Sequence, residues 1–115
     1  MNSERRIDLN ADVGEGFDDG AIARAVSSLN IACGAHAGDE TTMRAALALA
    51  KDFGLAAGAH PGYPDRDGFG RTETGLPAGA IGATVLRQVG QLAALAKESG
   101  LRLAHVKPHG ALTTA

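Results

Sequence analysis

Carboxylates, imidazoles and a lysine recur in this chain directly after short apolar runs. Each of four apolar runs is followed by one pair of them, namely Asp12 and Glu15, His36 and Asp39, His60 and Asp65, and Lys107 and His109. Side chains of these types transfer protons, neutralise anions and bind metal ions. If the runs are parallel strands, their carboxyl ends meet at one edge of a sheet, where α/β proteins build their sites. We therefore expect all of them except Asp39 and Asp65 to converge on one site.

Structural roles are the alternatives for the same side chains. His36 can start a helix, His60 can be a turn histidine bonded to backbone, and Asp39 favours a helix N-cap. His105 is expected to be buried and neutral against a backbone carbonyl. Lys107 is hardest to explain structurally, because a lysine in an apolar strand needs a facing anion. Cys33 favours the core over a role as nucleophile.

Alternating strands and helices must position these residues. The expected elements are strands at Arg6–Val13, Ser28–Cys33, Leu55–His60 and Leu103–Lys107, helices at Gly20–Val26, Glu40–Phe53 and Pro77–Ser99, and a long loop at Pro61–Leu76. The middle helix has a clear apolar stripe, with Asp39 before it and Gly54 after it. This order favours parallel pairing, in either a doubly wound sheet or a (β/α) barrel. In it, Asp8, Asn10 and Asp12 share one strand face, and His105, Lys107 and His109 share another.

Composition narrows the function class. The chain has 115 residues, enough for one domain, with a formal net charge of −2 and a single cysteine. The negative net charge excludes the basic signature of a nucleic-acid binder. The single cysteine excludes a disulfide framework and a cysteine-rich zinc site. No apolar run is long enough to span a bilayer, and no apolar signal region precedes Ile7, so we expect a cytoplasmic protein. There is no P-loop, so ATP binding by this chain alone is not supported.

Five blocks of sequence resemble the LamB/YcsF family of lactam-utilization proteins, which form the A component of 5-oxoprolinase. They appear in the family's order, from about residue 7 to 112, and are DLNADVGEG (8–16), NIACGAHAGD (30–39), GAHPGYPD (58–65), GFGR (68–71) and VKPHGAL (106–112). The resemblance implies an α/β fold, a distorted (β/α) TIM-like barrel with parallel strands. Residues 1–115 would form a partial barrel domain, its N-terminal half, with roughly the first four strands and three helices.

The resemblance also implies a function. Family members open 5-oxo-L-proline to L-glutamate by ATP-dependent hydrolysis, together with partner subunits B and C. ATP would be a co-substrate of the complex. The family continues for about as many residues again, so we expect this chain to be inactive alone.

For that reaction the expected site has two groups of residues. The catalytic candidates, with Asp12 or Glu15 as base, are Asp12, Glu15, His60, Lys107 and His109; the substrate-binding candidates are Asn10, His36 and Arg71. An alternative is a metal-dependent, deacetylase-like hydrolase of carbohydrates or amides, with a divalent ion on Asp12, His36 and His60. A third reading is an inactive fragment.

Overall fold

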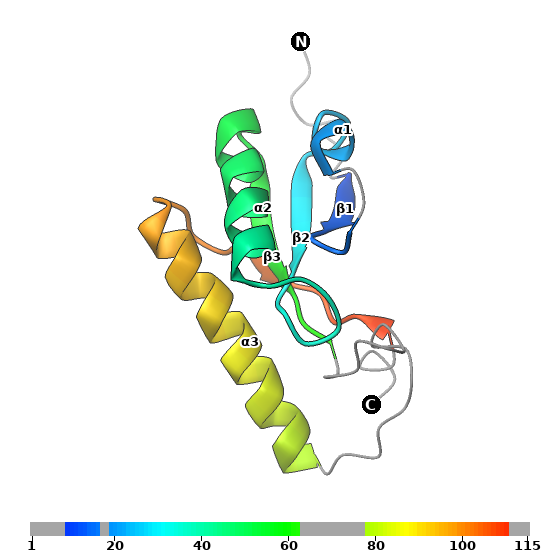
Figure 1. Ribbon diagram of the computed structural model, residues 1–115, viewed down its shortest axis with the longest axis vertical. Helices are drawn as coiled ribbons and strands as arrows, with labels where there is room; N and C mark the ends of the chain where they lie inside the picture. The colour runs from blue at the N-terminus through cyan, green and yellow to red at the C-terminus, as the bar shows by residue number, and fades with distance from the viewer. Residues whose placement is uncertain (1–8, 17–18, 63–77, 111–115) are drawn as a thin grey trace, which may run out of the picture.

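The computed structural model describes residues 9–16, 19–62 and 78–110. Its elements, in chain order, are β1 (Asn10–Val13), α1 (Asp19–Ala23), β2 (Ser28–Ala32), α2 (Glu40–Phe53), β3 (Ala56–His60), α3 (Ala78–Glu98) and β4 (His105–Val106). The strands form one parallel sheet in the order β1-β2-β3-β4 (Figure 1).

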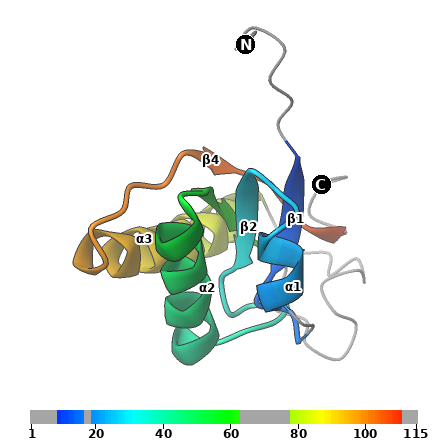
Figure 2. The ribbon, with the colours of Figure 1, turned by 90° about the horizontal axis from the view of Figure 1, so that it is seen from above.

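Strand order separates the two architectures that the sequence leaves open. In a doubly wound sheet the order reverses at a switch point, whereas here each strand lies beside the next in sequence. All three helices lie side by side against one face of the sheet, as Figure 2 shows, and α2 contacts both β2 and β3. An α/β sheet wound in one direction with helices on one side is the arrangement of a (β/α) barrel.

Strand parity assigns the two faces of the sheet. In β1, β2 and β3, odd-numbered residues face the helices, and Leu29 and Ile31 are fully buried with Met43 and Leu47 of α2. Even-numbered residues of these strands face the other side, and in β4 the register puts odd-numbered His105 on that side. Asp12, Asn30, Gly58 and His105 form one row there, which we call the polar row, with one residue from each strand in register. The helix side is therefore the apolar core, and the opposite side carries the polar groups.

The middle helix is confirmed residue for residue. The side chain of Asp39 accepts a hydrogen bond from the backbone N–H of Thr42, and the Thr42 hydroxyl pairs with the backbone of Asp39, which forms a capping box. Gly54 ends the helix in the left-handed conformation. The N-cap alternative for Asp39 is thus the correct one.

Cys33 is a core residue, and burial raises the pKa of its thiol to about 11.

Other boundaries differ from the prediction. The first helix ends at Ala23 rather than Val26, because Ser27 and Ser28 already donate backbone hydrogen bonds to Leu9. Leu9 itself is exposed, since no described helix covers the sheet there. β4 is assigned only at His105–Val106, although the backbone N–H groups of Lys107 and His109 still bond to Ala59 and Pro61. The predicted loop lies outside the described residues, apart from Pro61 and Gly62.

The buried face of α3 is apolar over only part of its length. Leu92, Leu95 and Ala96 are buried in its C-terminal half, but Thr84 and Gln88 are buried on the same face nearer its start. These two polar side chains lie over the end of β3, and their role belongs to the site. Within the described part of the chain, no helix combines the length and apolar character needed to cross a bilayer.

Candidate functional site

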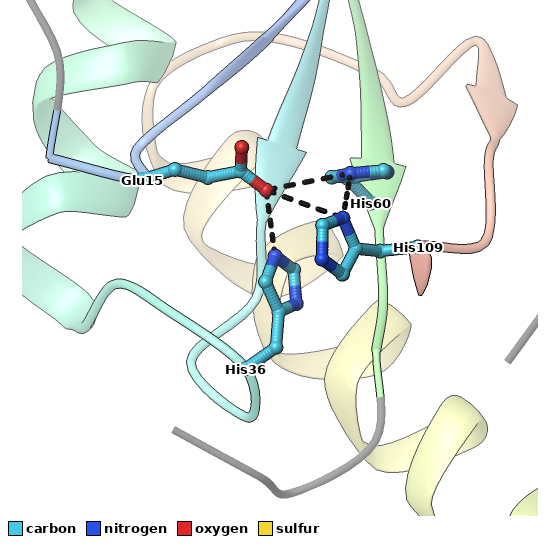
Figure 3. Close-up of side chains that lie close together, drawn as sticks. All are labelled: Glu15, His36, His60 and His109. Carbon is cyan, nitrogen blue, oxygen red and sulfur yellow. Dashed lines mark hydrogen bonds and ion pairs between the residues drawn. The ribbon is translucent and has the colours of Figure 1, made fainter. Parts of the chain in front are cut away.

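The carboxyl ends of all four strands bring their polar side chains together, as predicted. Glu15 follows β1, His36 lies in the loop after β2, His60 is the last residue of β3, and His109 follows β4. Figure 3 shows these four side chains pointing toward one another, and we call them the imidazole cluster. Each comes from a different strand–loop connection, so only the assembled sheet can create the cluster.

Glu15 is the centre of the imidazole cluster. Its Oε2 lies 2.7 Å from Nε2 of His36, 3.4 Å from Nε2 of His60 and 3.5 Å from Nδ1 of His109. The Glu15 side chain is 7% exposed and the three histidines are buried. A buried carboxylate needs partners that donate hydrogen bonds or carry positive charge, and the imidazoles fill that need.

The tautomer of His60 follows from its contacts. Nδ1 of His60 lies 2.7 Å from the carbonyl oxygen of Lys107, which can only accept, so Nδ1 carries the proton. In neutral His60, Nε2 then presents a lone pair toward Nδ1 of His109, 2.9 Å away. Burial lowers the pKa of His60, partly offset by its hydrogen bond to Lys107 and by nearby carboxylates, which favours this neutral form.

Ring orientations divide the three imidazoles. His36 and His109 are stacked, with ring centroids 3.8 Å apart and planes within 7°. His60 stands edge-on to both, at interplanar angles of 88° and 87°. The nitrogen lone pairs of His36 and His109 therefore lie in parallel planes, whereas His60 approaches from a perpendicular direction.

Asp12 and Lys107 form a more exposed pair beside the imidazole cluster. Nζ of Lys107 donates to Oδ1 of Asp12 at 3.0 Å, and Oδ2 of Asp12 lies 3.4 Å from Nε2 of His60. The Lys107 side chain is 49% exposed and that of Asp12 is 32% exposed. Burial raises the pKa of Asp12, but hydrogen bonds from Lys107 and Asn30 and the charges of His60 and Lys107 outweigh it, so the pKa is lowered overall. The anion that Lys107 was expected to face is thus Asp12.

Hydrogen bonds connect this pair to the side chains of Asn30, Asn10 and His105. Nδ2 of Asn30 donates to Oδ1 of Asn10 at 2.9 Å and to Oδ1 of Asp12 at 3.1 Å, while its own Oδ1 lies 2.6 Å from Nε2 of His105. His105 therefore contacts a side chain rather than the backbone carbonyl that we expected. To reach β2 from β4 its ring crosses over β3 at Gly58, where any Cβ would overlap the ring.

Asn30 is a site residue that the sequence analysis missed. It lies in a run of otherwise small or apolar residues, and its burial in the row is a consequence of strand register. Strand parity was the signal that could have shown this role, because Asn30 is the residue of β2 that lies in register with Asp12 on the same face of the sheet. Asn10, predicted to bind substrate, lies two residues before Asp12 in β1 and contacts Asn30.

Gln88 is a second missed residue. Its Oε1 accepts from the N–H of Gly62 at 3.0 Å, and its Nε2 donates to the carbonyl of Gly62 at 2.8 Å and to the Thr84 hydroxyl at 3.0 Å. Gly62 in turn lies so close to His36 that a Cβ there would meet the ring. Gln88 thus holds Gly62, in the segment after β3, against the His36 ring.

Other features complete the site as far as it is described. An open pocket of about 360 Å³ adjoins Glu15 and His36 and extends to Thr42 at the start of α2. Arg71, predicted to bind substrate, lies outside the described residues. Among the described residues, the four side chains of the imidazole cluster have donor atoms that all lie within 4.8 Å of one another; this group contains His36 and His60 of the predicted metal set but not Asp12.

Comparison with known proteins agrees with this fold. Residues 7–115 match the LamB/YcsF family. A crystal structure of a lactam utilization protein from Thermus thermophilus is similar to this chain at 49% sequence identity and a TM-score of 0.89. The similarity covers 92% of this chain but 45% of that protein, so this chain spans less than half of its length.

Proposed function

The chain belongs to the LamB/YcsF family, and from this we propose that it carries part of the active site of a lactam hydrolase. The proposed reaction is the ATP-dependent opening of 5-oxo-L-proline to L-glutamate, carried out with partner subunits B and C. The observation that carries the proposal is the buried imidazole cluster beside the exposed Asp12–Lys107 pair. Acids, bases and a cation within contact of one another are what hydrolysis of an amide needs.

Hydrolysis of a lactam moves one water molecule across one C–N bond. In the proposed mechanism a carboxylate takes a proton from water, the hydroxyl adds to the ring carbonyl, and the ring nitrogen leaves with a proton. Asp12 is the better of the two candidate bases, because its carboxylate is partly exposed and ionised, whereas Glu15 is enclosed by imidazoles. An imidazole of the cluster donates the proton that the ring nitrogen gains.

Lys107 is suited to hold the anionic part of the substrate. Its ammonium group is half exposed at the mouth of the site, and its present partner is the carboxylate of Asp12. We propose that it neutralises the carboxylate of 5-oxoproline or a phosphate on the activated substrate. A compact ammonium point charge serves either anion.

ATP enters the proposal through the chemistry of the substrate. An amide carbonyl is a poor electrophile, and transfer of the γ-phosphoryl group of ATP to its oxygen, with release of ADP, makes the carbonyl carbon more electrophilic. After water has added and the ring nitrogen has left, the phosphoryl group remains on the new carboxyl group, and a second water molecule releases it as inorganic phosphate. The sequence of this chain contains no P-loop, so we assign nucleotide binding to the partner subunits. A reaction that consumes ATP belongs in the cytoplasm, which we propose as its location.

The test combines the protein that carries this chain with subunits B and C, ATP and 5-oxoproline, and measures glutamate. We expect turnover that requires all five components and that falls at least about 100-fold in Asp12→Asn, the loss expected for a general base. The matched control is Asp52→Asn, a change at an exposed position of α2, which should keep full turnover. Turnover without ATP, or an Asp12→Asn variant with unchanged activity, would contradict the proposal.

A further inference from the structure

We propose that Glu15, His60 and His109 bind one divalent transition-metal ion and leave a fourth coordination position open. This deepens the proposed function, because the ion would lie in the same site, and it rests on that function for its role. The binding itself rests on the geometry of the imidazole cluster (Figure 3).

The donor atoms have the spacing of a tetrahedral metal site. Metal–ligand bonds of about 2.0–2.2 Å separate the donors of a tetrahedron by roughly 3.3–3.6 Å. Oε2 of Glu15 lies 3.4 Å from Nε2 of His60 and 3.5 Å from Nδ1 of His109. The third edge, between the two imidazole nitrogens, is 2.9 Å, because a hydrogen bond closes it. The proton in that bond, on Nδ1 of His109, is the one that an ion would displace.

Neighbouring groups orient two of the ligands as metal sites require. Ligating histidines almost always donate their other ring N–H to a carbonyl or carboxylate, and Nδ1 of His60 does so to Lys107. Glu15 is held through the same Oε2 by Nε2 of His36, at 2.7 Å. Two imidazoles and one carboxylate form a set that binds zinc and similar ions at catalytic sites, where water or substrate takes the remaining position.

His36 is assigned to orienting Glu15 rather than to the ion. Its ring is stacked on that of His109, with planes within 7°, so their in-plane lone pairs cannot converge on one point between them. Asp12 is left out of the set because Lys107 and Asn30 donate hydrogen bonds to its Oδ1, and because only Nε2 of His60 among the ligand atoms has a contact with its Oδ2, at 3.4 Å. The metal set predicted from the sequence, Asp12, His36 and His60, therefore shares only His60 with the set proposed here.

The proposed chemistry is that of a Lewis acid. An ion in this position would polarise the carbonyl of the lactam, next to the carboxylate of Asp12. His60 and His109 would then be ligands, and His36 would be the imidazole of the cluster that does not bind the ion.

Metal content tests the proposal without any activity assay. The full protein is stripped with a chelator, titrated with Zn²⁺ by calorimetry, and analysed by mass spectrometry of metals after dialysis. We expect one ion per chain. Glu15→Gln and His109→Asn should each weaken Zn²⁺ binding by more than about 100-fold, while His36→Asn should keep one ion with affinity reduced about 10–100-fold, as for a residue that orients a ligand.

The control is His105→Asn, which removes the remaining histidine of the chain from outside the cluster and should leave the stoichiometry unchanged. Circular dichroism confirms that each variant is folded. No bound Zn²⁺ in the folded wild-type protein would overturn the proposal, as would an ion lost in His36→Asn but retained in His109→Asn.

Separate outcomes distinguish this proposal from the proposed function. Full ATP-dependent turnover by a protein that binds no Zn²⁺ would overturn the metal site and leave the function standing. One bound ion in a protein that does not open 5-oxoproline with ATP and its partners would support the site and overturn the function.

Discussion

Asp12 and Glu15 lie three residues apart, yet the structure places their carboxylates in different surroundings. Glu15 is enclosed by three buried imidazoles, whereas Asp12 is partly exposed and pairs with Lys107. Two carboxylates with different surroundings can take different roles in one reaction. We assign proton transfer to Asp12 and the organisation of the imidazoles to Glu15.

Replacing Lys107 by Met tests the pairing with Asp12. Because Lys107 contributes to the lowered pKa of Asp12, its removal should raise that pKa. A base acts only when deprotonated, so the acid limb of the pH profile of kcat/KM should move to higher pH. We also expect KM for 5-oxoproline to rise about tenfold or more, since the substrate carboxylate loses its cation.

Lys51→Met is the matched control, because Lys51 lies in the last turn of α2, away from the site. An acid limb that stays in place in Lys107→Met would show that Asp12 is not the group titrating in that profile.

At the scale of elements, the contact between β2 and β4 depends on a gap in β3. The His105 ring reaches Asn30 only because Gly58 has no side chain in the row between them. Register alone places these three residues opposite one another, so the contact between His105 and Asn30 depends on three strands together.

Gly58→Ala should destabilise the protein by about 1–3 kcal/mol, because the added methyl group displaces the His105 ring in a packed layer. Chemical denaturation with a two-state fit measures the change. Gly90→Ala is the control: Gly90 lies in α3 with open space around it, and alanine there should be neutral or stabilising by up to about 1 kcal/mol. Equal effects of the two substitutions would show that the His105 ring does not depend on Gly58.

Helix α3 acts on the site through one side chain. Gln88→Met keeps the length of the side chain but leaves both backbone groups of Gly62 without their amide partner. An unsatisfied buried polar group costs about 1–3 kcal/mol, and we expect a loss of stability in that range. We also expect a lower kcat, because Gly62 forms a wall of the His36 ring.

Gln91→Met is the control for that variant, since Gln91 is exposed on the next turn of α3. A Gln88→Met variant with wild-type stability and kcat would show that Gly62 is held by other contacts.

At the scale of the whole molecule, the described sheet has two edges and one uncovered face. β1 and β4 each pair on one side only, the polar row lies on the face away from the helices, and the imidazole cluster lies at the carboxyl ends of the strands. Parallel sheets are normally covered on both faces, and in a closed barrel the lumen side is filled by opposing strands.

A polypeptide of residues 1–115 expressed alone should therefore associate through its open strands or melt without a sharp transition. Analytical ultracentrifugation over a range of concentrations and a thermal melt would measure this. The control is the similar lactam utilization protein from Thermus thermophilus, 45% of which this chain matches, and it should show the more cooperative melt. A monodisperse 115-residue monomer with a cooperative melt would show that the four-stranded unit is self-sufficient.

The sequence by itself determined the elements and the edge at which the chemistry gathers. Apolar periodicity located α2 to the residue, and the polar residues after each strand predicted convergence, because parallel strands share a carboxyl edge. Five motif blocks identified the family. These features are local, or follow from the direction of the strands, so spacing along the chain is enough to show them.

Only the tertiary structure decided which side chains touch. Gln88 belongs to no motif block, and Asn30 begins one that assigns it no role; their roles depend on register and on how α3 lies over β3. The choice of Glu15 and His109 over Asp12 and His36 as metal ligands depends on ring planes and on distances between atoms from four separate strand ends. Contacts between residues far apart in sequence are set by packing, which leaves no periodic trace in the chain.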